Sequence, residues 1–207
     1  MQKNADRRVM LREAGILAVI TLIAGLVLGF VNELTKEPIR MQKEKAVQAA
    51  CMAVFRGAGE AGTAFQKLDY MPGEELAEEL SANGVKIGTV YEALAEDGTC
   101  QGYVVQSTST EGYGGNIVIY AGVTTQGVLN GISILEISET PGLGMQAGKV
   151  LVPQFEKKAV GSFTYTKTGS RSESEIDAIS GATITTNAVT NAVNGALTVA
   201  QDLMGGR

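Results

Sequence analysis

The sequence contains no histidine, no tryptophan and only two cysteines in 207 residues. The absence of histidine excludes a Ser-His-Asp triad, a Cys-His dyad, a zinc site built on imidazole and a histidine-ligated haem. Two cysteines are too few for a four-cysteine iron–sulfur cluster within the chain. Any chemistry must therefore come from carboxylates, hydroxyls, lysine or a cofactor that the protein carries.

Basic residues are also scarce, because 17 Lys and Arg stand against 22 Asp and Glu and give a net charge of −5. A nucleic-acid-binding surface needs clustered positive charge to neutralise phosphates. This acidic chain has no long basic run, so no nucleic-acid partner is expected. The content of 44% hydrophobic and 19% charged residues is typical of a globular protein.

Residues 14–32 form a run of 19 residues without a charge. A helix of this length spans roughly 28 Å, close to the hydrocarbon thickness of a bilayer. A cleaved signal peptide is one alternative, but its apolar stretch is usually about 7–15 residues long, and residues 30–33 make a poor cleavage site. A buried helix of a soluble protein is the other alternative. We expect a retained transmembrane helix over residues 14–34.

The charge distribution predicts an orientation for this helix. Residues 1–13 hold four basic and two acidic residues, a net charge of +2, which leaves −7 for the rest of the chain. The positive-inside rule therefore places residues 1–13 in the cytoplasm and residues 35–207 outside it. Cys51 and Cys100 would then lie where disulfides can form. Their spacing leaves their pairing open, and the apolar surroundings of Cys51 favour a core residue.

Beyond the apolar run, the pattern predicts an α+β domain with antiparallel strands. We expect a helix over 36–55 that continues from the membrane helix and is ended by residues 57–62, and a short acidic helix over 74–80. Four strands separated by turn residues should form a meander with one buried face: 85–94, 102–108, 116–122 and 128–137. A short helix over 150–157, a strand over 163–167 and a C-terminal helix over 184–204 complete the prediction.

The segment before the C-terminal helix is the main candidate for chemistry. It consists of Asp177 followed by Ser180-Gly181-Ala182-Thr183. A helix beginning near Ser180 would present unpaired N–H groups and a partial positive charge, which suit a phosphate. The small residues let a bulky group approach the backbone, and Thr183 places a hydroxyl in the first turn. The structural alternative is that Ser180 simply caps the helix.

Two other segments combine glycine with rigid or aromatic residues. One is the loop Glu139-Thr140-Pro141-Gly142-Leu143-Gly144, and the other is the turn Gly112-Tyr113-Gly114-Gly115. Neither has the glycine spacing of a P-loop or of a dinucleotide-binding fingerprint. Taken alone, each is also explained as an economical turn.

Residues 177–183 resemble the flavinylation motif of the covalent FMN-binding domain family. The loop over 139–144 and the turn over 112–115 resemble the other signature segments of that family. Together with the N-terminal membrane helix, residues 10–205 are similar to the G subunits of Rnf complexes, which are ion-pumping ferredoxin:NAD⁺ oxidoreductases. The C subunit of the sodium-pumping NADH:quinone reductase shares the domain but is typically longer.

The resemblance implies a cofactor and roles for individual residues. FMN would be attached to Thr183 by a phosphodiester bond. A separate flavin transferase would recognise the residues before it: Asp177, Ser180, Gly181 and Ala182. Four residues of the proline-containing loop would line the isoalloxazine ring: Glu139, Thr140, Gly142 and Leu143.

The implied function is that of an electron-transfer subunit of a membrane-bound Rnf complex. The chain has no nicotinamide-binding motif, so it should relay electrons rather than bind the terminal substrates. Its partners would be the other membrane subunits, the transferase during maturation, and membrane lipid. The alternatives are a stand-alone membrane-anchored flavoprotein for extracytoplasmic electron transfer, a C subunit of the sodium-pumping reductase, or a binding module without a cofactor.

Overall fold

The computed structural model describes residues 2–55 and 63–205, with side chains from residue 10 onward. The chain divides into two compact units, Met1–Lys45 and Ala46–Arg207. The first unit is part of helix α1 (Gln2–Val54), which is one continuous helix with Pro38 inside it. The helix predicted over 36–55 is therefore confirmed as a direct continuation of the apolar helix, and it ends at Val54. The helix break expected at residues 57–62 lies outside the described residues.

The apolar part of α1 is long and apolar enough to cross a membrane, judged by length and composition. An 18-residue window within Met10–Val54 has a mean hydropathy of 2.6, and none of it is buried. Leu17, Leu26 and Phe30 are among its largely exposed side chains. An apolar surface this continuous needs a nonaqueous cover. The lack of burial argues against the alternative of a soluble core helix.

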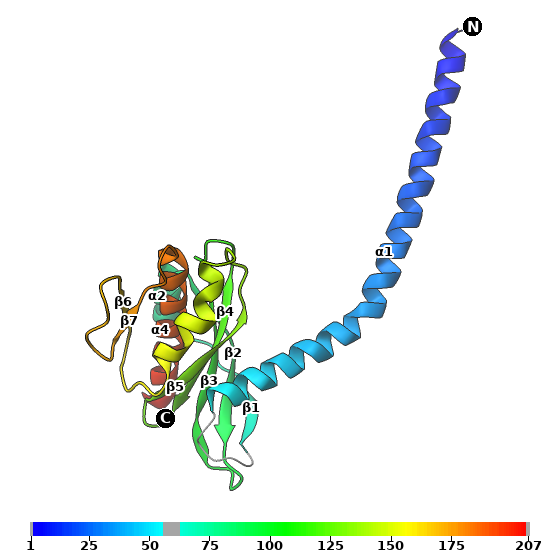
Figure 1. Ribbon diagram of the computed structural model, residues 1–207. Helices are drawn as coiled ribbons and strands as arrows, with labels where there is room; N and C mark the ends of the chain where they lie inside the picture. Colours follow the sequence, from blue (N-terminus) through cyan, green and yellow to red (C-terminus); the bar gives the residue numbers. More distant parts are fainter. Residues whose placement is uncertain (1, 56–62, 206–207) are drawn as a thin grey trace. The chain divides into compact units, whose positions relative to one another are not determined.

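The second unit is built on a five-stranded antiparallel sheet (Figure 1). Its strands follow one another in chain order: β1 (Ala64–Leu68), β2 (Val85–Leu94), β3 (Cys100–Ser109), β4 (Ile117–Thr124) and β5 (Leu129–Glu136). The predicted meander is confirmed, and the bounds of β2 agree with the prediction. Strand β1 was not predicted, because it is a short edge strand with only three apolar residues in five.

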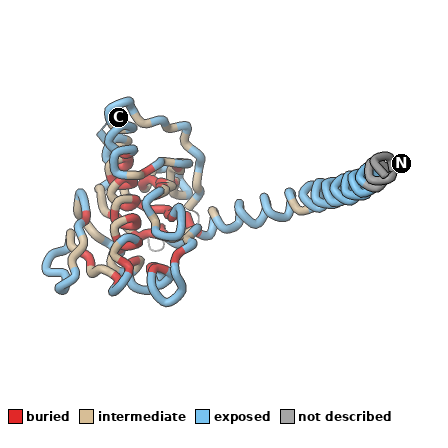
Figure 2. Tube along the Cα trace, turned by 90° about the horizontal axis from the view of Figure 1, so that it is seen from above, coloured by how far each residue is buried: buried red, intermediate tan, exposed pale blue. Residues whose placement is uncertain are grey.

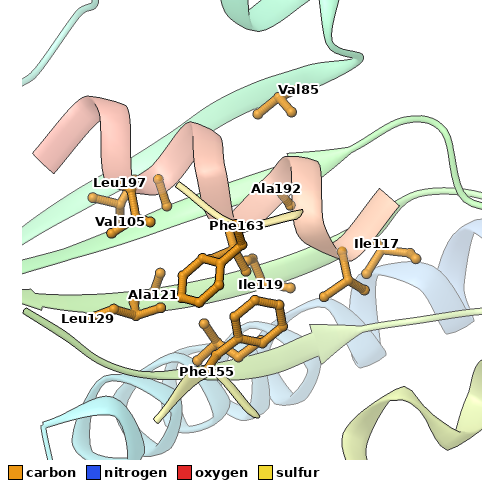
Figure 3. Packing of buried hydrophobic residues seen from close by; sticks show 14 of the residues in the cluster. Val85, Val105, Ile117, Ile119, Ala121, Leu129, Phe155, Phe163, Ala192 and Leu197 are labelled. Atoms are coloured by element: carbon orange, nitrogen blue, oxygen red, sulfur yellow. The ribbon is translucent and has the colours of Figure 1, made fainter. Parts of the chain in front are cut away.

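Two helices cover one face of this sheet, the C-terminal helix α4 (Thr183–Gly205) and the short helix α2 (Glu74–Ala82). Figure 3 shows Ala192 and Leu197 of α4 beside side chains of the central strands, including Val105 and Ile119. These residues belong to one buried apolar cluster. Burial of this cluster holds α4, and therefore its first turn, at a fixed place on the sheet.

The last turns of α1 cover the opposite face of the sheet. Cys51 and Val54 form a second buried cluster with Val104 of β3 and Tyr120 of β4. Gly122 allows this close approach, because a Cβ there would lie 2.8 Å from the carbonyl oxygen of Val54. Strand β4 is therefore buried on both faces, and the prediction of a half-buried meander is wrong for this strand. Figure 2 shows that the buried residues gather in the second unit, whereas the N-terminal helix is exposed along most of its length. Successive residues of a strand point to opposite faces, so both clusters draw on β3 and β4.

The segment after β5 differs from the predicted helix over 150–157. It consists of three short helical pieces: η1 (Gly144–Gln146), α3 (Ala147–Val150) and η2 (Val152–Phe155). Pro153 has no N–H to donate, so α3 cannot continue through it as an α-helix. Strand β6 (Thr164–Thr166), close to the predicted strand, pairs in parallel with β7 (Glu175–Asp177). Strand β7 was not predicted, because its flanks are polar.

Candidate functional site

A pocket with a volume of about 510 Å³ lies between the loop that follows β5 and the first turn of α4. This volume falls within the range of roughly 300–1,000 Å³ that is common for small-molecule and cofactor sites. Ten residues line it: Tyr113, Glu139, Thr140, Leu143, Gly144, Gly181, Ala182, Thr183, Ile184 and Thr185. All three segments singled out in the sequence therefore contribute to one pocket.

The first turn of α4 presents unpaired backbone donors. The helix begins at Thr183, and the carbonyl of Ala182 accepts the N–H of Thr186 at 3.0 Å. The three intervening N–H groups, of residues 183–185, have no partner among the residues that the structure describes. Donors at the start of a helix, together with its dipole, attract an anion. The first turn of α4 is therefore a candidate anion site in the lining of this pocket.

Ser180 does not cap α4, which corrects the structural alternative considered for the motif. It lies three residues before the helix, and Gly181 follows it with a φ of +76°, a conformation that favours glycine. The hydroxyl of Thr186 stabilises this turn instead. It accepts the N–H of Ile179 at 3.1 Å and donates to the carbonyl of Ala182 at 2.9 Å.

The three threonines at the start of α4 differ in the accessibility of their hydroxyls. Thr185 and Thr186 are buried, and both hydroxyls donate hydrogen bonds, the first to Glu139 and the second to Ala182. Thr183 is only half-buried, and its hydroxyl has no hydrogen-bond partner in the described part of the chain. Of these three side chains, Thr183 has the hydroxyl that is free to react.

Glu139 connects the three segments that form the pocket. It is only 7% exposed. Its Oε1 accepts the N–H of Gly114 at 3.2 Å, and its Oε2 accepts the hydroxyl of Thr185 at 2.9 Å. The missing Cβ of Gly144 leaves room for this arrangement, because a Cβ there would lie 2.5 Å from the Thr185 hydroxyl oxygen. One carboxylate thus joins the turn over 112–115, the loop over 139–144 and helix α4.

Apolar side chains form the open wall of the pocket. Leu143 is 41% exposed and Ile184 is 52% exposed, and Tyr113 is exposed as well. Gly181 keeps the space beside Leu143 clear, because a Cβ there would lie 3.2 Å from Leu143 Cδ2. Water-exposed apolar side chains around a cavity favour a ligand with a flat or apolar part.

The structure brings six of the nine predicted site residues to the pocket: Thr183, Gly181, Ala182, Glu139, Thr140 and Leu143. Ser180 and Gly142 lie in exposed turns outside its lining, and Gly142 has a φ of +79° that its turn requires. Asp177 also lies outside the lining, in β7. Its carboxylate accepts the N–H of Ser170 at 2.6 Å, and its own N–H donates to Gln154 at 2.7 Å.

Four lining residues were not predicted as site residues. Tyr113 and Gly144 belong to the two glycine-containing segments that the sequence analysis singled out. The same glycine pattern could therefore have predicted them as site residues. Ile184 and Thr185 follow Thr183 in α4. Sequence alone could not show which side of the first helical turn faces the loop after β5.

Comparison with known proteins matches two family models to the chain. The FMN-binding domain matches residues 112–198, which include every lining residue of the pocket. The RnfG N-terminal region matches residues 1–54.

Similar proteins cover the chain almost completely. The G subunit of the Na⁺-translocating ferredoxin:NAD⁺ oxidoreductase complex of Acetobacterium woodii is 30% identical over 96% of this chain and 95% of its own length. The G subunit of the proton-translocating ferredoxin:NAD⁺ oxidoreductase complex of Clostridium ljungdahlii is 30% identical over the full length of both chains. Among solved structures, NqrC of Shewanella oneidensis aligns with a TM-score of 0.47 at 17% identity, over 76% of this chain and 74% of that one. On the evidence of the relatives and both family models, the chain belongs to the RnfG family, the G subunits of Rnf complexes, and contains an FMN-binding domain.

Proposed function

We propose that this protein carries FMN on Thr183 through a phosphodiester bond and relays electrons within a membrane-bound Rnf complex. One observation carries the proposal. The free hydroxyl of Thr183 lies beside unpaired N–H groups in a pocket that also has an apolar wall. Membership of the RnfG family supports the electron-transfer role and the other membrane subunits as partners.

The residues of the pocket fit the two chemically different parts of FMN. The N–H groups of residues 183–185 suit the phosphate, and Leu143, Ile184 and Tyr113 suit the ring. When bound, FMN supplies transfer of one or two electrons. The chain itself holds the phosphate at the start of α4, excludes water from one side of the ring, and keeps the backbone at Gly181 free of a side chain.

Attachment at Thr183 requires a separate transferase. A threonine hydroxyl is a weak nucleophile without a neighbouring base. The sequence has no histidine to act as this base. The carboxylate of Glu139 already accepts hydrogen bonds from the Gly114 N–H and the Thr185 hydroxyl. The transferase would supply the base that takes the Thr183 proton, together with an FMN phosphate activated as an anhydride. The Thr183 O–P bond would then form as the anhydride P–O bond breaks.

Peptide mapping tests the attachment. The full chain, co-produced with a flavin transferase, should fluoresce under ultraviolet light in a denaturing gel, and without the transferase it should not. Trypsin should release residues 172–207 as one peptide, because Arg171 is the last cleavable residue before the C-terminus. We expect this peptide to carry the mass of FMN less one water, with fragmentation locating it at Thr183. Unmodified peptide from transferase-containing cells would contradict the proposal.

We further propose that residues 14–34 span the membrane and that the FMN-binding domain lies outside the cytoplasm. The two cysteines are free thiols of unequal exposure, since Cys51 is buried and Cys100 is partly exposed. A membrane-impermeant maleimide added to intact spheroplasts should label Cys100, whereas Cys51 should react only after denaturation. A Gln2→Cys variant reports the opposite side and should gain a second label only after lysis. Labelling of Cys100 that also requires lysis would reverse the orientation.

A further inference from the structure

We infer that the Glu139 carboxylate is a fixed negative charge in the wall of the pocket and that it lowers the midpoint potential of FMN bound there. This inference rests on the proposed flavin site. It concerns the electrostatic effect of the Glu139 side chain on the cofactor, whereas the proposed function only places Glu139 in the lining of the pocket.

Hydrogen bonding holds the Glu139 carboxyl group in one position. Both of its oxygens accept a hydrogen bond, one from a backbone N–H and one from the Thr185 hydroxyl. An ionised carboxylate is an acceptor at both oxygens. The absence of side chains at Gly112 and Gly144 leaves room for the carboxylate in this position. A Cβ at either position would lie within 2.9 Å of one of its oxygens.

No cation neutralises this charge among residues 10–55 and 63–205. The two ion pairs found in that part of the chain both involve Arg40 of α1, with Glu37 and with Glu44. The partial positive charge at the start of α4 stabilises the carboxylate only in part, because it is a fraction of one elementary charge. The pocket therefore contains a net negative charge on its wall.

A negative charge in this place disfavours reduction of a flavin. Uptake of two electrons and one proton adds one negative charge to the ring system. Like charges that are close and poorly solvated repel more strongly than in water. A charged group near the ring is one of the means by which a protein sets the midpoint potential of a bound flavin. The Glu139 carboxylate should thus shift the equilibrium of bound FMN towards the oxidised form.

A Glu139→Gln variant tests the inference in the flavin-loaded full chain. The amide has a similar shape, can still accept the Gly114 N–H, and can donate to the Thr185 oxygen, but it carries no charge. We expect at least a tenfold higher ratio of reduced to oxidised flavin at a fixed potential. That ratio corresponds to a midpoint potential raised by about 30 mV for a two-electron couple. Redox titration followed by flavin absorbance measures the change.

Two further variants separate charge from geometry. Glu139→Asp keeps the charge and should return the potential towards the wild-type value. Thr185→Val keeps the carboxylate but removes one of its donors, so the potential should lie at or below that of the wild type.

An unchanged potential in fully loaded Glu139→Gln protein would overturn the inference, and so would a rise in Thr185→Val. If the Gln variant does not fold, the same redox titration of a Glu139→Ala variant, which also removes the charge, decides the matter: a rise supports the inference and an unchanged potential overturns it. A wild-type chain without flavin would contradict the proposed function instead, so the two failures are distinguishable.

Discussion

Thr183→Val is expected to abolish covalent flavin while leaving the fold intact. The substitution deletes the hydroxyl oxygen but preserves the β-branched shape, which valine shares with threonine. The Thr183 hydroxyl has no hydrogen-bond partner among the described residues, so its loss should change the free energy of unfolding by no more than about 0.5 kcal/mol. In-gel fluorescence and the mass of the intact protein measure the loss, which should be complete.

Two controls accompany this variant. Thr183→Ser retains a hydroxyl at the same place and should retain flavin. Thr198→Val removes a hydroxyl from the same helix and the same tryptic peptide. That hydroxyl donates to the carbonyl of Asn194, far along α4 from the pocket, so flavin loading should be normal. Covalent flavin on the Thr183→Val protein would refute the assignment, and the peptide would then show which hydroxyl carries it.

Gly114→Ala should destabilise the protein and disrupt the pocket together. A Cβ at this position would overlap the carbonyl group of Ser138. Because this group belongs to the backbone, it cannot turn aside as a flexible side chain could. The loop must therefore move, and Glu139 moves with it. Overpacking of this kind costs about 1–3 kcal/mol in the free energy of unfolding. Urea denaturation followed by circular dichroism, with flavin loading in parallel, measures both effects.

Gly148→Ala is the matched control for Gly114→Ala. Gly148 lies in helix α3, and a Cβ there would meet no heavy atom within 4 Å. Alanine is favoured over glycine in helices by up to about 1 kcal/mol, so this variant should be as stable as the wild type or slightly more so. Normal stability and normal flavin loading in Gly114→Ala would show that the turn over 112–115 does not position the loop.

The sequence predicts well those elements whose pattern is local. Alternating side chains and turn pairs located β2 to β5, and the apolar stripe located α4 to within one residue at each end. The pattern could not show that β4 is covered on both faces, because the covering residues Cys51 and Val54 come from a helix more than 60 residues earlier. The short strands β1 and β7 were also not predicted, because pairing with other strands, rather than a local sequence pattern, stabilises them.

In the candidate site, too, features that depend on local sequence were predicted and features that depend on packing were not. Residues that belong to compact motifs, such as Gly181 and Thr183, were predicted from the sequence. The position of Tyr113 in the lining depends on how the turn before β4 meets the loop after β5. The failure of Ser180 to cap α4 depends on the positive φ of Gly181, which moves the helix start to Thr183. Neither feature follows from spacing.

The packing of the last turns of α1 against the sheet determines where the chain can be shortened. These turns belong to the second compact unit, which begins at Ala46. A shortened protein that begins after Phe55 would leave Val104, Tyr120 and Ala93 uncovered on one face of the sheet. That face would then favour aggregation. A soluble version that begins just before Ala46 would omit the apolar run and still keep both layers of the domain.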